Sequence, residues 1–265
     1  MNIKGTNFVL KTFFILTIMY VVVTDILIFF NSDLFGNEYY FIGNKFSVIY
    51  KHLELLMLIL VCEKKKRSRI HIVKALILCF ITCWVAVEVQ SATGIAGVII
   101  FLAVYFLIPE RLLYNPLFFF SILVGSALIV FAIDVILSWA PVKIFITDIL
   151  KRDMSLTGRI DIYAAIPKLL KGHLLFGYGY NTAYEVWTNY SWYMPNAQNG
   201  LINFIFEQGI FSALCVILYG VKTFSLVKTK DFRSKFKPMA ALIIGYSLIA
   251  TIEIVIDITL SLIHI

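Results

Sequence analysis

Long apolar runs alternate along the chain with short polar segments. A helix needs about 20 residues to cross a bilayer core about 30 Å thick, so each long run predicts one membrane-spanning helix. About seven spans follow from this length criterion, and they lie at Phe8–Phe30, Phe46–Cys62, His71–Val89, Gly94–Ile108, Pro116–Trp139, Leu201–Phe224 and Met239–Ile263. The predicted fold is therefore an all-α polytopic membrane protein.

One long polar segment interrupts this pattern and divides the chain into three parts. Transmembrane helices are predicted at 1–139, an extracytoplasmic loop at 140–200, and further transmembrane helices at 201–265. The loop is the part of the chain that is rich in Gly, Tyr, Trp, Asn and charged residues, so we expect it to hold the functional site.

Short helices are predicted inside this loop. Apolar residues recur at helical spacing over Pro141–Lys151 and over Arg159–Ile166. Ser155 or Thr157 could cap the second of these helices, and Pro167 is expected to break or kink it.

Composition supports lipid as the main solvent of the chain. Hydrophobic residues make up 60% of the sequence and the mean hydropathy is +0.89, whereas soluble domains are about 45–50% apolar. The net charge of +7 does not indicate a nucleic-acid partner, because most of the basic excess lies in two short interhelical runs, Lys64–Arg69 and Lys228–Lys237. The four cysteines lie in or beside apolar runs without metal-ligand spacing, so neither a metal nor another cofactor is predicted.

The two basic runs also predict the orientation, since short cytoplasmic loops carry an excess of Lys and Arg. Both runs are placed inside by this rule, and alternate crossings then give a cytoplasmic N-terminus and put 140–200 on the outer face. The loop is itself basic, with Lys143, Lys151, Arg152, Arg159, Lys168 and Lys171. Two interpretations stay open: a surface facing solvent or lipid headgroups, or an electropositive site for an anionic substrate.

Six carboxylates lie within or at the ends of the predicted spans, where an ionised group is costly. They are Asp25, Glu54, Glu88, Asp134, Glu253 and Asp257, and on the predicted topology all fall in the outer half of their helices. Glu253 and Asp257 share one helix face, and either could accept a proton. The alternative is that these groups snorkel or make hydrogen bonds that orient the helices.

The loop offers residue types that suit lipid-linked sugars. Arg152 and Arg159 could bind phosphate, while Asp161 and Glu185 could contact the sugar or accept a proton. Asn196 or Asn199 could cap the next span, whose first amides would then form an anion site.

Aromatic residues form a second group of candidate sugar ligands. Tyr178 and Tyr180 alternate with glycines in a turn where positive φ would let a ligand approach the backbone, and Trp187 and Trp192 follow. Stacking on sugar faces is one interpretation, and the aromatic belt of a membrane interface is the other.

Four motifs in this order resemble those of the O-antigen ligase and Wzy-type polysaccharide polymerase family. They are Ser155-Leu-Thr-Gly-Arg159, Leu174-Leu-Phe-Gly-Tyr-Gly-Tyr180, Asn196-Ala-Gln-Asn-Gly-Leu201 and Glu207-Gln-Gly209, and the upstream Gln90–Gly97 resembles the family's short outer turn. The resemblance covers the chain from about Glu88 to Phe211. The family usually has more helices than this chain.

The resemblance implies a metal-independent glycosyltransferase. Such an enzyme joins undecaprenyl-pyrophosphate-linked oligosaccharide repeat units on the outer face of the bacterial cytoplasmic membrane, for a capsule, an exopolysaccharide or an O-antigen. Arg159 matches the loop arginine expected to bind pyrophosphate, and Gln198 stands where ligases commonly have a histidine expected to activate the acceptor hydroxyl. Besides membrane lipid, a chain-length regulator and a flippase are the implied partners.

Two sets of site residues follow from these arguments. The catalytic set is Arg159, Gln198, Asn199, Glu253 and Asp257, and the substrate-binding set is Arg152, Asp161, Tyr178, Tyr180, Glu185, Trp187, Trp192 and Asn196. Three other functions stay open: a ligase that transfers finished polymer, a polysaccharide flippase or transporter, and a non-catalytic scaffold.

Overall fold

A computed structural model describes residues 3–30, 44–62, 69–144, 147–148, 159–191, 196–227 and 229–251. These residues form helices and turns without any strand, so the all-α prediction is confirmed for this part of the chain. The chain divides into two compact units, one of Met1–Leu113 with Lys228–Gly245 and one of Tyr114–Val227 with Tyr246–Ile265. The described residues of 140–200 thus fall in the same unit as the helices that flank them.

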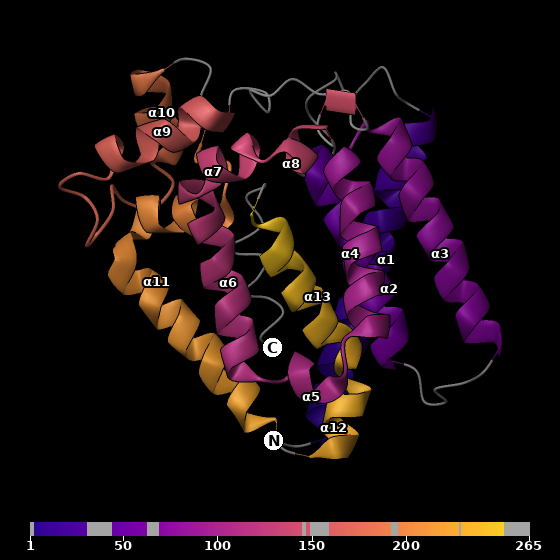
Figure 1. The fold of residues 1–265 in the computed structure, drawn as a ribbon. Helices are drawn as coiled ribbons and strands as arrows, with labels where there is room; N and C mark the ends of the chain where they lie inside the picture. The colour runs from indigo at the N-terminus through magenta and orange to yellow at the C-terminus, as the bar shows by residue number, and fades with distance from the viewer. Residues whose placement is uncertain are drawn as a thin grey trace. The chain divides into compact units, whose positions relative to one another are not determined.

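The first unit contains four long helices near the N-terminus (Figure 1). They are α1 (Ile3–Phe30), α2 (Lys45–Cys62), α3 (Arg69–Glu88) and α4 (Ala92–Leu107), followed by the short α5 (Glu110–Leu113) and later by α12 (Lys230–Lys235) and the start of α13 (Lys237–Ile249). Their core includes Val48, Ile49, Val85, Ala86 and Val89. For α1 to α4 these bounds agree with the predicted spans to within a few residues. Helix α13 ends at Ile249, and most of the remainder of the expected span Met239–Ile263 lies outside the described residues.

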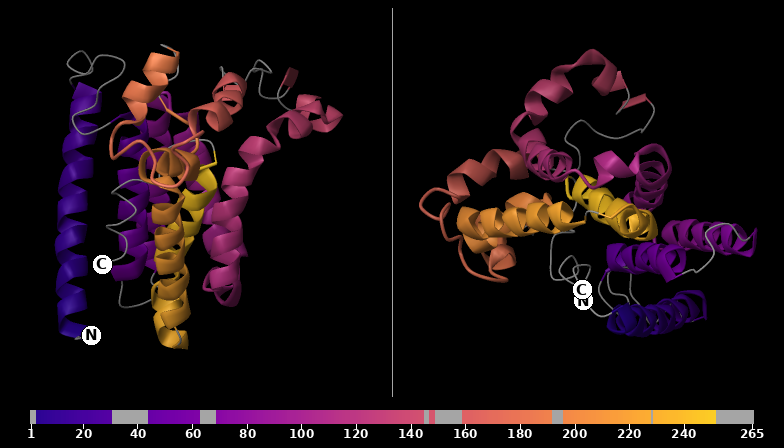
Figure 2. Two further views of the ribbon diagram at one scale, coloured as in Figure 1. Left: turned by 90° about the vertical axis from the view of Figure 1, so that its left-hand side faces the viewer. Right: turned by 90° about the horizontal axis from the view of Figure 1, so that it is seen from below.

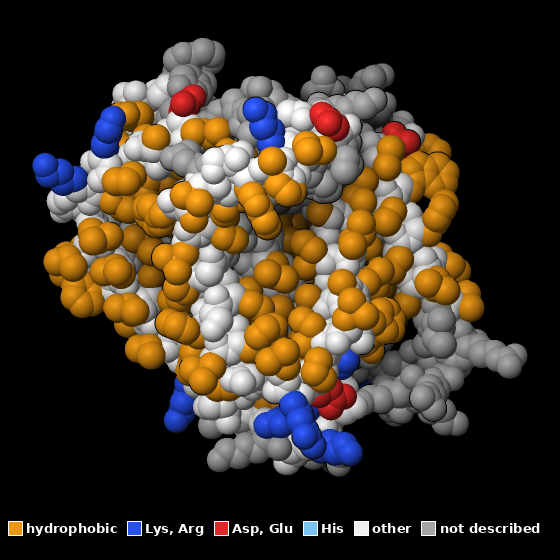
Figure 3. Space-filling model, in the orientation of Figure 1, with side chains coloured by type: hydrophobic (Ala, Val, Ile, Leu, Met, Phe, Trp, Pro, Cys, Tyr) orange, Lys and Arg blue, Asp and Glu red, His pale blue; other side chains and the backbone are white. Residues whose placement is uncertain are grey.

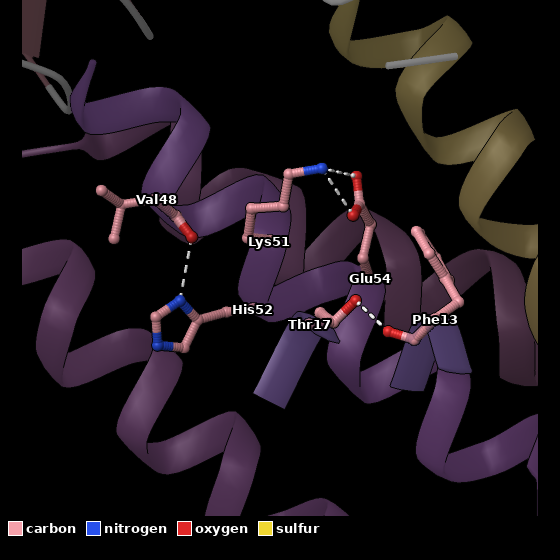
Figure 4. Close-up of polar contacts among 6 residues, drawn as sticks. All are labelled: Phe13, Thr17, Val48, Lys51, His52 and Glu54. Atoms are coloured by element: carbon pink, nitrogen blue, oxygen red, sulfur yellow. Dashed lines mark hydrogen bonds and ion pairs between the residues drawn. The ribbon is translucent and has the colours of Figure 1, made fainter. Parts of the chain in front are cut away.

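Several polar groups inside the first unit are paired (Figure 4). The Glu54 carboxylate is buried and accepts two hydrogen bonds from the Lys51 ammonium of the same helix, at 2.8 and 3.0 Å. His52 is fully buried, with Nδ1 2.9 Å from the Val48 carbonyl and Nε2 3.1 Å from Asp25 Oδ2. Because the contact between Asp25 and His52 joins α1 to α2, it supports the interpretation that carboxylates in the spans orient the helices.

The second unit contains α6 (Pro116–Phe131), α7 (Ile133–Ser138), α8 (Ala140–Ile144), α9 (Arg159–Leu169), α10 (Ala183–Tyr190) and α11 (Gly200–Leu226). Helices α6 and α11 pack closely through Phe119 and Phe224, whose rings stack at 4.9 Å. Gly220 permits this approach, because a Cβ there would lie 2.6 Å from Phe119 Cε1.

One local prediction in this unit is wrong. The expected span Pro116–Trp139 is two helices, since the backbone at Ala132 leaves the helical region. Helix α9 continues through Pro167 to Leu169, so the proline does not break it at that point. The aromatic stretch Ala183–Tyr190 is a helix, which the sequence analysis did not predict. Of the expected helix Pro141–Lys151, the structure has α8, and most of the remainder lies outside the described residues.

Two of the described helices are long and apolar enough to cross a membrane, namely α1 over Phe8–Phe30 and α11 over Gly200–Ser225. Helices α4, α6 and α13 are apolar but shorter. Figure 3 shows hydrophobic side chains along the middle of the helices and charged side chains near their ends. The arrangement of seven spans stays a prediction.

Candidate functional site

The candidate site lies in the second unit, where the motifs of the loop meet the first half of α11. Helix α11 is not continuous, because Gly209 has φ 76° and ψ 170°. Figures 1 and 2 show that the two halves of α11 run in different directions. The sequence did not predict this interruption, which falls inside the expected span Leu201–Phe224, directly after Glu207 and Gln208.

A turn at Leu174–Gly179 supplies the hydrogen bonds that the interruption removes. The amides of Tyr178 and Gly179 donate to the carbonyls of Phe206 and Glu207, each at 2.9 Å, and the Ile210 amide donates to the Leu174 carbonyl at 2.9 Å. Carbonyls that would otherwise bond the next turn of α11 are therefore satisfied by the loop.

Two glycines allow this close approach of two backbones. A Cβ at Gly177 would lie 2.5 Å from the carbonyl carbon of Glu207, and a Cβ at Gly209 would lie 2.5 Å from Phe176 Cα. Gly177 and Gly179 have positive φ, as predicted for the turn. The group that approaches the Gly177 backbone is α11, however, and not a ligand.

We expect Gly209→Ala to lower the free energy of unfolding by at least about 2 kcal/mol, because this backbone region is nearly restricted to glycine and the methyl would overlap the turn. Gly177→Ala should behave similarly. Thermal unfolding in detergent measures the effect. The matched control is Gly125→Ala in α6, where nothing lies within 4 Å of the added methyl, and a gain of about 0.5–1 kcal/mol is expected. Equal stability of Gly209→Ala and the unmodified protein would contradict the role of the interruption.

The turn places Tyr178 and Trp187 in an aromatic stack. The Tyr178 ring lies between His173, at 3.8 Å, and Phe206, at 4.8 Å. The Trp187 ring is fully buried and packs on Phe206 at 5.3 Å. Other rings pack on both side chains in this structure, and these contacts favour a packing role over sugar stacking. Tyr180 is largely exposed and remains a candidate for sugar stacking.

Asn199 fixes the start of α11. Its Oδ1 accepts from the Ile202 amide at 3.0 Å, which confirms that Asn199 is a helix cap. Its Nδ2 donates to the carbonyls of Ser126 and Thr251, at 3.0 and 3.2 Å, and the Gly200 amide donates to Ala250 at 2.8 Å. Asn199 is fully buried and its hydrogen-bonding groups are used, so its contacts here are structural. The Gly200 and Ile202 amides at this helix end already have acceptors, which does not favour the expected anion site.

Asn199→Ala should lower the free energy of unfolding by about 1–3 kcal/mol, because it removes the cap and leaves buried carbonyls without a donor. Asn199→Asp should not rescue stability, since a carboxylate oxygen would face the Ser126 and Thr251 carbonyls. The measurement is thermal unfolding. The control variant is Asn189→Ala, at an exposed position in α10. A stable Asn199→Asp protein would show that these two contacts contribute little.

Gln198 and Asn196 form a tight turn before this cap. Gln198 has φ 50°, and both its backbone amide and its Nε2 donate to Asn196 Oδ1 at 2.9 Å. The Tyr163 hydroxyl donates to the Gln198 carbonyl at 3.4 Å. Tyr163 belongs to α9, so this helix contacts the Asn196–Asn199 segment.

A hydrogen-bonded chain leads from this segment to Glu207. The Ala197 amide donates to Asn203 Oδ1 at 3.3 Å, and Asn203 Nδ2 donates to Glu207 Oε1 at 3.4 Å. The Asn181 amide donates to Glu207 Oε2 at 3.3 Å. Among the described residues Glu207 makes no ion pair.

Asn203 and Glu207 were absent from the predicted site. The available signal was their spacing, because Asn199, Asn203 and Glu207 are four residues apart and lie on one face of an otherwise apolar helix. A polar row of this kind in an apolar span indicates a structural or functional contact.

The remaining predicted residues are dispersed or outside the described part. Asp161 and Glu185 are exposed on the first turns of α9 and α10. The structure places Arg159 at the first position of α9. Arg152, Trp192, Glu253 and Asp257 lie outside the described residues.

Comparison with known proteins gives no match to any family model, curated protein or solved structure.

Proposed function

We propose that this protein is an integral membrane glycosyltransferase that joins undecaprenyl-pyrophosphate-linked oligosaccharide repeat units on the outer face of the bacterial cytoplasmic membrane. One observation carries the proposal. The segments of Arg159 and of Gln198, far apart in sequence, are in contact through the hydrogen bond from Tyr163 to Gln198. Arg159, the residue expected to bind pyrophosphate, belongs to the helix that makes this contact with the segment suited to sugar hydroxyls.

The proposal includes a membrane location with a cytoplasmic N-terminus and the loop outside. Its support is the exposed surface of the two long apolar helices. Phe8, Ile15 and Met19 of α1, and Leu214 and Leu218 of α11, are exposed hydrophobic side chains. Such surface is costly in water and is expected in lipid.

The chemistry requires an acceptor hydroxyl, a donor and a proton acceptor. The hydroxyl oxygen attacks the anomeric carbon of the donor, the bond from that carbon to the pyrophosphate oxygen breaks, and undecaprenyl pyrophosphate leaves. Arg159 would stabilise the charge that develops on the pyrophosphate. The proton of the hydroxyl passes to a carboxylate of the protein.

Glu207 is the carboxylate that we assign to this step. It is partly buried, its partners are neutral amides, and Asn203 connects it to the Asn196–Gln198 segment. Neutral donors hold a carboxylate in position. A neighbouring cation would also stabilise its negative charge and so make it a weaker proton acceptor. Glu185 and Asp161 are exposed, and no hydrogen bond connects either of them to this segment among the described residues.

Arg159→Ala should lower polymerisation by about 10²–10³ at near-normal protein levels, because one positioned charge donor is lost. Arg159→Lys should restore only part of the activity, since an ammonium cannot make the two parallel hydrogen bonds of a guanidinium. The assay follows lengthening of lipid-linked oligosaccharide by purified protein in detergent. Transfer of finished polymer without lengthening would indicate a ligase, and full activity of Arg159→Ala would remove the arginine from the mechanism.

Glu207→Gln should lower the rate of lengthening by about 10²–10⁴, because the carboxylate that accepts the proton is lost. Gln keeps an acceptor for the Asn181 amide but turns an amide nitrogen toward Asn203 Nδ2, so the free energy of unfolding should fall by about 1 kcal/mol. Glu88→Gln, at an exposed position at the end of α3 and outside the predicted site residues, is the matched control and should keep full activity. A rate of lengthening near normal in Glu207→Gln, with the lower stability, would make Glu207 a structural residue.

A further inference from the structure

The turn Leu174–Phe176 exposes three consecutive apolar side chains. Leu174, Leu175 and Phe176 are 46%, 51% and 76% exposed. They belong to the otherwise polar loop and do not form part of the aromatic stack described above. An exposed apolar group of this kind usually marks a contact with a partner or with lipid.

The backbone of this turn is fixed beside the second half of α11. The Ile210 amide donates to the Leu174 carbonyl, and the rings of Phe176 and Phe211 are 5.6 Å apart. The turn is therefore level with the first helical turn after Gly209 and is held there by main-chain hydrogen bonds.

The length of this half of α11 indicates where the turn lies in a bilayer. Ile210–Leu226 rises about 25 Å at about 1.5 Å per residue, which is slightly less than a hydrocarbon core of about 30 Å. All of this half, including Phe211, is then needed to cross the core. A side chain beside Phe211 lies within the outer edge of the hydrocarbon.

We propose that the turn Leu174–Phe176 inserts into the outer leaflet and contacts lipid acyl chains. The inference rests on the membrane location proposed above and is independent of the glycosyl transfer. Acyl chains are favoured over a second copy of this chain because the exposed apolar surface continues from the turn onto α11, at Phe211, Leu214 and Leu218.

Charge beside the turn fits this occupant. Lys168 and Lys171 precede the turn and are exposed, and no Asp or Glu lies between Lys168 and Tyr180. Ammonium groups next to an inserted apolar turn meet the phosphates of anionic headgroups, as at other membrane interfaces. The apolar turn thus matches the acyl-chain layer of one leaflet, and the two lysines match its headgroup layer.

Nitroxide labelling tests the proposal. Single labels are introduced as Leu175→Cys, Leu218→Cys and Asn189→Cys in a protein whose four native cysteines, all unpaired, are replaced by alanine. Collision rates with oxygen, which partitions into lipid, and with a water-soluble nickel chelate are measured in phosphatidylglycerol vesicles. The ratio of oxygen to nickel collisions at residue 175 should be close to that at Leu218 in α11 and severalfold above that at Asn189.

Every other outcome overturns the proposal. A ratio at residue 175 like that at Asn189 places the turn in water. Low collision rates with both probes place it against protein, including a second copy. A water-like ratio at Leu218 removes the membrane premise itself. Loss of glycosyl transfer in Glu207→Gln leaves the labelling result unchanged, so the two proposals fail separately.

The lysines are tested in the same vesicles. Replacing phosphatidylglycerol by phosphatidylcholine should lower the collision ratio at residue 175, and Lys168→Gln with Lys171→Gln should abolish this dependence on the headgroup. The lysines would be removed from the proposal if the collision ratio still depended on the headgroup in the double variant, or if it did not depend on the headgroup in either protein.

Discussion

The interruption of α11 at Gly209 is the constraint on which the second unit depends. A helix that breaks leaves carbonyls without their helical partners. The amides of Tyr178 and Gly179 satisfy two of these carbonyls, which fixes the turn against α11. That register in turn stacks Tyr178 on Phe206 and brings the Asn181 amide to Glu207. The arrangement of the candidate site thus follows from the hydrogen bonds that the turn makes to the interrupted helix.

The sequence predicts helices well where run length decides and poorly where backbone geometry decides. The expected span Phe46–Cys62 and the observed α2, Lys45–Cys62, agree because a mostly apolar run of this length favours a single helix. The interruption at Ala132 was missed because apolar residues precede and follow it, and the one at Gly209 because the expected span continued through its polar residues Glu207 and Gln208. The hydrogen bonds that stabilise the interruption at Gly209 come from residues distant in sequence, which a periodic pattern does not contain.

The site was predicted from residue types alone. Whether each of its residues can meet a ligand depends on the neighbours that the fold places over it. Asn199 was expected as a cap from a local signal, and the cap is confirmed, but its contacts with Ser126 and Thr251 depend on the fold. Tyr178 and Trp187 have the rings that a sugar needs, yet Phe206 covers both. Chemistry alone cannot distinguish a ring that packs from a ring that binds. The prediction that Gly177 and Gly179 adopt positive φ in a turn is confirmed. The group that approaches the Gly177 backbone is α11, where a ligand was expected.

Gln198 shows why the proton acceptor is sought elsewhere on α11. A non-glycine residue with φ 50° is strained, and the bonds from its amide and Nε2 to Asn196 Oδ1 hold it in that form. The side chain then offers a ligand its carbonyl oxygen and its second Nε2–H, and an amide oxygen accepts a hydrogen bond without taking a proton. Glu207 is linked through Asn203 to the amide of Ala197, directly before Gln198. In the proposed mechanism, an amide that orients the hydroxyl and a carboxylate that removes its proton would divide between two residues the role that the sequence analysis expects of one histidine in ligases.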